Sequence, residues 1–245
     1  MRTVTPLAEA HLLGDDERDA ATALFARCFA EEPWNAALVE VLPSCEEQQA
    51  FLLGSCRTDL ACFAAWGGVL VASRTGSGGA ASGGGNADVA DGDTGATGAA
   101  PPPVGLALVG GRDMPTASDF DALRTRGFEK GCEALPPQSR TLLSARLEQM
   151  EAFSNGQWMG GLCTGDFRYL YAICVDAACR GTGAFDHLMG PVAAECDRLG
   201  MPLFLECYTG HLAALYGSRG FEVTGTTPMP DLGLTEYRMI RQPQA

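Results

Sequence analysis

The chain has 245 residues, of which 46% are hydrophobic, and a formal net charge of −13 at pH 7. This length and apolar content suffice for a sizeable core, in one large domain or two small ones. The negative charge repels phosphate backbones and anionic headgroups, so we expect neither a nucleic-acid nor a membrane-surface partner. No run of 18 apolar residues is present, and the N-terminus lacks the apolar run of a signal peptide, so we expect a cytoplasmic protein.

The chain contains ten cysteines, a number that could indicate a metal site or a disulfide framework. None of them forms a C-x-x-C pair, and no histidine lies nearby at ligand spacing. We therefore expect reduced, structural cysteines and no metal site.

The first quarter of the chain has two helical patterns. An amphipathic helix is predicted behind Asp15 or Asp16 as N-cap, and Pro33 is expected to end it. Residues 46–66 predict a second helix, which Gly54 interrupts.

Two short β-branched runs, residues 68–73 and 104–111, predict strands that flank a segment rich in glycine and alanine. That segment, residues 74–103, has no aromatic residue and cannot bury enough surface to offset its ordering entropy. We interpret residues 1–245 as one domain in which 74–103 is a flexible insertion, because closure entropy grows slowly with loop length. Two helices and then alternating strands and helices follow at 118–135, 139–153, 167–175, 183–200, 202–208, 211–220, 221–226 and 235–241.

A glycine turn stands out in VDAACRGTGAFDHLM, residues 175–189. An apolar strand leads into Gly181 and Gly183, and apolar residues at helical spacing follow at once. The residues from Arg180 to Ala184 then present unpaired N–H groups at a helix N-terminus, which is a geometry that binds phosphate or diphosphate. A tight turn that holds no ligand is the structural alternative.

One family with such a turn is the dinucleotide-binding proteins. Their G-x-G-x-x-G fingerprint aligns with Gly181 and Gly183, and Glu206 lies on the next strand. Asp186, however, occupies the third glycine position, and five residues separate Val175 from the first glycine. Too little chain follows Glu206 to complete a doubly wound sheet, so we regard this alternative as weaker.

A second family matches more motifs. The turn reads R-G-T-G-A-F at 180–185, its helix ends in ECDRLG, the next strand closes on PLFLE, and L-Y-G-S-R-G-F follows at 215–221. In this order the motifs resemble those of the GCN5-related N-acetyltransferases, and in particular the branch of the puromycin-type antibiotic acetyltransferases. The resemblance covers residues 167–241, and the rest matches only in its order of elements. It implies an α/β (α+β) fold whose mixed central sheet, flanked by helices, is splayed between the fourth and fifth strands.

The resemblance also implies acetyl-CoA as co-substrate, with its pantetheine between strands 170–175 and 203–207. The N–H of Val175 or Cys174 is then the expected donor to the oxyanion. The cofactor-binding residues that it implies are Ile173, Cys174, Val175, Arg180, Gly181, Thr182, Gly183, Ala184 and Phe185. Three residues depart from the family pattern: Ala177 replaces a proline, Phe185 replaces a small residue, and Leu212 replaces an asparagine near the cofactor.

The expected catalytic residues are Tyr216 and Glu206. Tyr216 matches the family's general acid, because a phenol stays protonated at neutral pH and can return a proton to a thiolate. Glu206 is the candidate base or ammonium ligand, although a strand-end carboxylate can also be structural. His211 is a further candidate for a proton relay, whereas Cys207 is expected to be a packing residue.

The resulting hypothesis is an acetyl-CoA-dependent N-acetyltransferase that transfers acetyl to a small-molecule amine by direct attack in a ternary complex. The acceptor wall is expected from residues 25–50 and 112–165, where the match is weakest. A catalytically inactive acyl-CoA-binding or sensor module remains an alternative, which Leu212 and Phe185 favour and Tyr216 opposes.

Overall fold

The computed structural model describes residues 7, 9–74, 101–110, 117–152, 158–159, 162–163 and 165–244. Its helices are α1 (Arg18–Glu31), α2 (Pro33–Val39), α3 (Cys45–Ala65), α4 (Ala117–Cys132), α5 (Pro137–Glu151), α6 (Ala184–Leu199) and α7 (Gly210–Gly217). Its strands are β1 (His11–Leu12), β2 (Val69–Ser73), β3 (Pro103–Gly110), β4 (Arg168–Val175), β5 (Leu203–Cys207), β6 (Glu222–Met229) and β7 (Leu234–Arg241). None of the helices in these ranges is long and apolar enough to cross a membrane.

The strands form one mixed sheet in the order β1-β2-β3-β4-β5-β7-β6. Only β4 and β5 pair in parallel, and they pair at two positions, Arg168 with Leu203 and Tyr169 with Phe204. Beyond Tyr169 the two strands have no further pairs. The prediction of a mixed sheet splayed between the fourth and fifth strands is therefore confirmed.

A β-bulge at Tyr171 accompanies the separation of β4 from β5. Val109 of β3 pairs with Leu170, whereas the preceding Leu108 pairs with Ala172, so Tyr171 is the extra residue. A bulge bends its strand and increases the local twist. The bend lies next to the place where pairing with β5 stops.

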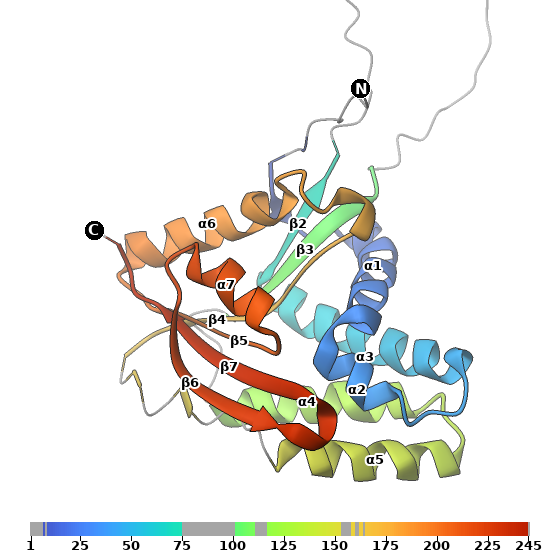
Figure 1. Ribbon diagram of the computed structural model, residues 1–245. Coiled ribbons are helices and arrows are strands. Elements are labelled where there is room, and N and C mark those ends of the chain that lie inside the picture. Colours follow the sequence, from blue (N-terminus) through green and yellow to red (C-terminus); the bar gives the residue numbers. More distant parts are fainter. Residues whose placement is uncertain are drawn as a thin grey trace, which may run out of the picture.

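Helices cover both faces of the sheet (Figure 1). On one face α6 packs against β2, β3 and β4, and α7 contacts β6 and β7. On the other face α1 and α3 contact β3, and α4 packs on α3. The dinucleotide-binding alternative is wrong, because it requires a doubly wound parallel sheet and this sheet is mostly antiparallel.

The first helix starts later than predicted, whereas its end agrees with the prediction. Asp15–Glu17 form a 3₁₀ turn, and α1 begins only at Arg18, so neither Asp15 nor Asp16 is its N-cap. The carboxylate of Glu17 instead accepts from the N–H of Gly14 at 3.1 Å. Pro33 ends α1 as predicted but also opens α2, because a proline is well tolerated in the first helical turn. β1 is too short to show a sequence pattern.

Gly54 lies inside α3 and does not interrupt it. A Cβ at this position would lie 2.9 Å from the carbonyl oxygen of Lys130 and 3.0 Å from the Cα of Gly131. The glycine therefore lets α4 approach α3 closely, which compensates for its low helix propensity. β2 and β3 are antiparallel neighbours, and most of the predicted insertion between them, residues 75–100, lies outside the described residues.

Candidate functional site

The glycine turn connects β4 to α6 and depends on two left-handed residues. Gly181 has φ of 77° and Gly183 has φ of 90°, a region that other residues adopt only with strain. A Cβ at either position would meet nothing within 4 Å, so the turn borders open space. The two glycines are required by backbone conformation, and the space beside them can accommodate a ligand.

The main-chain N–H groups of the turn divide into two sets. The N–H of Thr182 is used inside the turn, where it donates to the carbonyl of Cys179 at 3.3 Å. The N–H of Gly181 and of Gly183 has no acceptor among the described residues. At the start of α6 the N–H groups from Ala184 to Asp186 precede the first i to i−4 bond, in which His187 donates to Gly183. Free donors thus surround the open space at the positive end of the α6 dipole.

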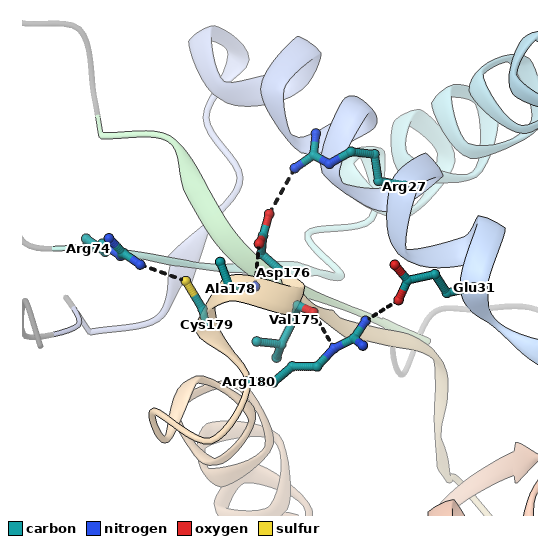
Figure 2. Close-up of polar contacts among 8 residues, drawn as sticks. All are labelled: Arg27, Glu31, Arg74, Val175, Asp176, Ala178, Cys179 and Arg180. Atoms are coloured by element: carbon teal, nitrogen blue, oxygen red, sulfur yellow. Dashed lines mark hydrogen bonds and ion pairs between the residues drawn. The ribbon is translucent and has the colours of Figure 1, made fainter. Parts of the chain in front are cut away.

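Ion pairs connect this turn to α1 (Figure 2). Arg180 donates to Glu31 at 2.8 Å, and Arg27 donates to Asp176 at 3.0 Å. Asp176 also accepts from the N–H of Ala178 at 2.9 Å, and this bond and Arg27 lower the pKa of its carboxyl below the usual range. The predicted cofactor residue Arg180 is therefore beside the turn but already paired.

The unpaired edge of β4 exposes alternate N–H groups. Asp176 donates to the carbonyl of Val104 on β3 at 2.8 Å. Because N–H groups alternate along an antiparallel strand, that of Cys174 also points to β3. The N–H groups of Ile173 and Val175 then point to the opposite edge, where β5 has separated from β4. Of the two oxyanion donors considered from the sequence, Val175 has its N–H on the open edge, whereas the N–H of Cys174 is directed to β3.

A cavity of about 440 Å³ lies beside this separation. Ile173 of β4, Glu206 of β5, and Leu212 and Tyr216 of α7 line it, so one space brings together residues from three predicted elements. Further residues of β4 and β5, among them Tyr169 and Tyr171, also line it, and the opposite side comes from α1, α2, α3, α4 and α5. The predicted acceptor wall at 25–50 and 112–165 contributes to it, and α3 contributes a part that the sequence did not indicate. His211 is exposed at the start of α7 and is not among the lining residues.

Tyr216 reaches the cavity from α7 and is 7% exposed. Its ring packs against Phe185 at a centroid distance of 5.9 Å and against Phe221 at 5.6 Å. The large side chain of Phe185 is thus accommodated in the core. Burial, and then the nearby Cys207, raise the pKa of Tyr216 above its ordinary value, so the hydroxyl stays protonated at every physiological pH.

Glu206 is half-buried, and its carboxylate lines the same cavity. It accepts hydrogen bonds from the indole N–H of Trp158 and from the hydroxyl of Tyr169, the latter at 3.3 Å. Burial raises the pKa of this carboxyl, and the two hydrogen bonds oppose the rise. A carboxylate in this setting can accept a proton or attract a cation.

Among the acidic residues of the cavity, Asp59 and Glu32 were not anticipated, and neither was Glu151 of α5. Asp59 of α3 lies on the apolar face defined by Cys56, Leu60 and Phe63, and a carboxyl in such a stripe is the signal that could have revealed it. Glu32 lines the cavity from the N-terminus of α2, where its carboxylate accepts from the N–H of Asn35 at 2.9 Å. Burial raises the pKa of both carboxyls, that of Asp59 to about 7.

Comparison with known proteins identifies the fold. No family model and no curated protein matches the sequence. A structure of histone acetyltransferase HPA2 and related acetyltransferase from Corynebacterium glutamicum matches with a TM-score of 0.59 at 17% identity, over 97% of each chain. The chain has the fold of the GCN5-related N-acetyltransferases.

Two acetyltransferases of small amines are also similar. The polyamine N-acetyltransferase of Drosophila melanogaster, which catalyses the formation of N-acetylagmatine, has a TM-score of 0.53 at 14% identity. Arylalkylamine N-acetyltransferase 2 of Aedes aegypti has a TM-score of 0.55 at 12% identity. The matches cover 96% and 97% of this chain, respectively, and 99% of each relative.

Proposed function

We propose that this protein is an acetyl-CoA-dependent N-acetyltransferase that acetylates a small cationic amine by direct attack in a ternary complex. The observation that carries the proposal is that one cavity is lined by Ile173 at the free edge of β4, by Tyr216 and Glu206, and by the acidic residues Glu32 and Asp59. A reaction between two bound substrates requires such a continuous space. The acetyltransferase fold supports the same conclusion.

The residues of the glycine turn fit the diphosphate of coenzyme A. The N–H groups of Gly181, Gly183, Ala184 and Phe185 have no acceptor among the described residues, and open space lies beside both glycines at this helix N-terminus. Arg180 adds a positive charge beside them, whereas Thr182 contributes less because its N–H is used within the turn.

The edge of β4 fits the amides of pantetheine. When bound, acetyl-CoA supplies an activated acetyl thioester. The N–H of Val175 is nearer the glycine turn and binds an amide carbonyl of pantetheine. The N–H of Ile173, which lines the cavity with Glu206 and Tyr216, takes the role first expected of Val175 or Cys174 and polarises the thioester carbonyl. Cys174 packs its side chain in the core, where the contact with Cys28 and then burial raise its pKa well above the ordinary value, so it is not a nucleophile.

Glu206 and Tyr216 have complementary roles in proton transfer. Glu206 accepts the proton of the incoming ammonium, so that a neutral amine attacks. The new nitrogen–carbon bond forms as the carbon–sulfur bond breaks, and Tyr216 donates its proton to the leaving thiolate. The second proton that the nitrogen loses as it becomes an amide returns to Tyr216. The two side chains line one cavity, and burial raises the pKa of both, which favours proton uptake by Glu206 and keeps the hydroxyl of Tyr216 protonated.

The acidic wall favours a cationic acceptor. Glu32, Asp59 and Glu206 all line the cavity, and an ammonium group compensates buried carboxylates better than a neutral molecule does. Two of the similar structures are acetyltransferases that act on polyamines or arylalkylamines. Within the superfamily we place the protein in the puromycin-type branch, on the motifs of residues 167–241.

An amine panel tests the proposed function. The full-length protein is incubated with acetyl-CoA and monoamines, diamines, guanidino-amines and arylalkylamines, and mass spectrometry detects N-acetylated products. A thiol reagent is unsuitable because all ten cysteines are free. Acetylation of at least one amine, abolished by omission of acetyl-CoA, is expected.

The same experiment separates the alternative, an acyl-CoA-binding or sensor module. This alternative is supported by Leu212, which places an apolar side chain on the cavity wall where many acetyltransferases carry an asparagine. Calorimetric binding of coenzyme A without turnover of any amine would support the module. Absence of coenzyme A binding would contradict both functions.

A further inference from the structure

We propose that Asp59 and Tyr171 form a subsite that binds a second cationic group of the acceptor, so that the preferred substrate is a dication such as an aliphatic diamine. The inference rests on the proposed function and specifies its substrate class. We refer to Asp59 and Tyr171 as the Asp59 subsite.

The carboxyl of Asp59 is buried and only half satisfied. Asp59 is 5% exposed, and its Oδ2 accepts from the hydroxyl of Tyr171 at 2.9 Å. Its Oδ1 is buried and has no hydrogen-bond partner among the described residues. Native proteins rarely leave a buried carboxyl oxygen unpaired, because its desolvation is not compensated. A cationic group in the cavity that Asp59 lines would compensate this carboxyl through an ion pair, without having to reach the buried Oδ1 itself.

The surroundings of Asp59 keep this carboxyl free of other side chains. Gly127 of α4 faces it, and a Cβ at that position would lie only 2.6 Å from Oδ1. Any larger residue at 127 would displace the carboxyl. The absence of a side chain at position 127 thus preserves the position of Asp59 at the cavity wall.

Two carboxyl–tyrosine pairs follow one another along β4. Glu206 pairs with Tyr169, and Asp59 pairs with Tyr171, two residues further along the strand. The two tyrosine rings are 6.4 Å apart between centroids. Glu206 comes from the β5 side of the cavity and Asp59 from the α3 side, so the pairs approach from different walls. This arrangement suits two cationic groups joined by a short chain.

The charged residues that line the cavity favour a dication as its ligand. The acidic lining residues are Glu32, Asp59, Glu151 and Glu206, and Arg124 is the one cation among the described residues that line it. Arg124 has contacts of its own, and a single cation cannot compensate the charges of four acidic residues. A monoamine would leave most of this negative charge unbalanced, whereas a diamine places a second positive charge near Asp59.

The subsite is tested by comparing 1,4-diaminobutane with n-butylamine, which has the same chain but a single amine. Calorimetry measures binding of each to the full-length protein, with and without coenzyme A, and mass spectrometry measures kcat and KM for acetylation. Diamines of three to six carbons then locate the preferred spacing. In the wild-type protein we expect the best diamine to bind at least roughly 10-fold more tightly than the monoamine.

Three variants separate a binding role from a structural role. Asp59→Asn keeps the shape of the side chain and should weaken diamine binding roughly 10- to 100-fold. The effect should raise KM and leave kcat unchanged, and the affinity for butylamine should change less than about twofold. Tyr171→Phe, which removes the hydrogen bond to Asp59, should have a smaller effect of the same kind. Asp231→Asn alters an exposed aspartate outside the cavity and should change nothing.

The possible outcomes distinguish this inference from the proposed function. Equal binding of mono- and diamine by the wild-type protein, or equal weakening of both by Asp59→Asn, overturns the subsite. Acetylation of monoamines without any preference for diamines overturns the subsite and leaves the proposed function intact. Selective diamine binding that is lost in Asp59→Asn, without acetylation of any amine, supports the subsite and contradicts the proposed function.

Discussion

The guanidinium of Arg180 donates to the carboxylate of Glu31 at 2.8 Å, and this ion pair connects the glycine turn to α1 (Figure 2). The two side chains are 54% and 58% exposed. A pair this exposed contributes about 1 kcal/mol at most to stability, because water and salt screen it. Its more important consequence is local, since Glu31 competes with any bound anion for Arg180.

Glu31→Gln is therefore expected to strengthen coenzyme A binding. The change frees Arg180 and removes a negative charge near the turn, and we expect Kd to fall roughly threefold to tenfold at low salt, with a smaller effect at high salt. Arg180→Gln should raise Kd by a similar factor. Glu195→Gln is the matched control. It removes the carboxylate that pairs with Arg168 of β4 at 2.7 Å, and Glu195 lies near the far end of α6 from the turn. Unchanged or weaker calorimetric binding by Glu31→Gln contradicts the competition.

Gly183→Ala is expected to destabilise the protein and to weaken coenzyme A binding. Nothing obstructs a Cβ at this position, so the cost is the strain of a left-handed alanine, about 1–2 kcal/mol. Gly165→Ala is a suitable control, because Gly165 is equally open and its φ is not in the left-handed region. Thermal denaturation and calorimetry should show losses only for Gly183→Ala. Equal effects of the two variants would rule out a special role for the turn.

Tyr216→Phe is expected to reduce kcat about 100-fold with KM for both substrates within about twofold. The ring remains packed against Phe185 and Phe221, so the change removes only the proton donor. Because burial raises the pKa of Tyr216, no loss of activity between pH 7 and 9 should come from its ionisation. Steady-state kinetics measure these quantities, and an undiminished kcat removes Tyr216 from the mechanism.

Asp59→Asn is expected to stabilise the protein increasingly as pH rises. Burial raises the pKa of Asp59 from 3.8 to about 7, so between these values the folded protein binds the proton more tightly than the unfolded chain does. The contribution of Asp59 to the free energy of unfolding of the wild-type protein is therefore fully present below about pH 4 and is lost as pH rises through 7. The facing Tyr171 and the nearby Cys56 have raised pKa values and do not titrate in this window.

Between pH 5 and 8 the asparagine variant should gain about 2–3 kcal/mol over the wild-type protein. Denaturant unfolding of both proteins at several pH values measures the difference, in which other titrating groups cancel. A difference that stays constant with pH would show that Asp59 has the same pKa in the folded and the unfolded protein, which contradicts the expected effect of burial. An acidic residue that lowers stability but lines a cavity is consistent with a role in binding a ligand there.

The glycine turn and the elements around it were predictable because their signals are local. The spacing of apolar residues indicated α6, and the consecutive residues of R-G-T-G-A-F indicated the strand–turn–helix order and the fold. The start of α1 was missed because Glu17 is held by contacts with Gly14 and His11 that compete with capping by Asp15 or Asp16. Such competition depends on geometry rather than on residue type.

The sequence by itself determined the order of helices and strands, the acetyltransferase fold and the residues of the glycine turn, because each depends on neighbours a few positions apart. Only the tertiary structure decided which N–H groups of β4 are free, since pairing with β3 selects alternate residues. It alone also brought Asp59 to Tyr171, 112 positions away in the chain. A cavity wall is assembled from side chains of distant segments, and no pattern within one segment encodes that contact.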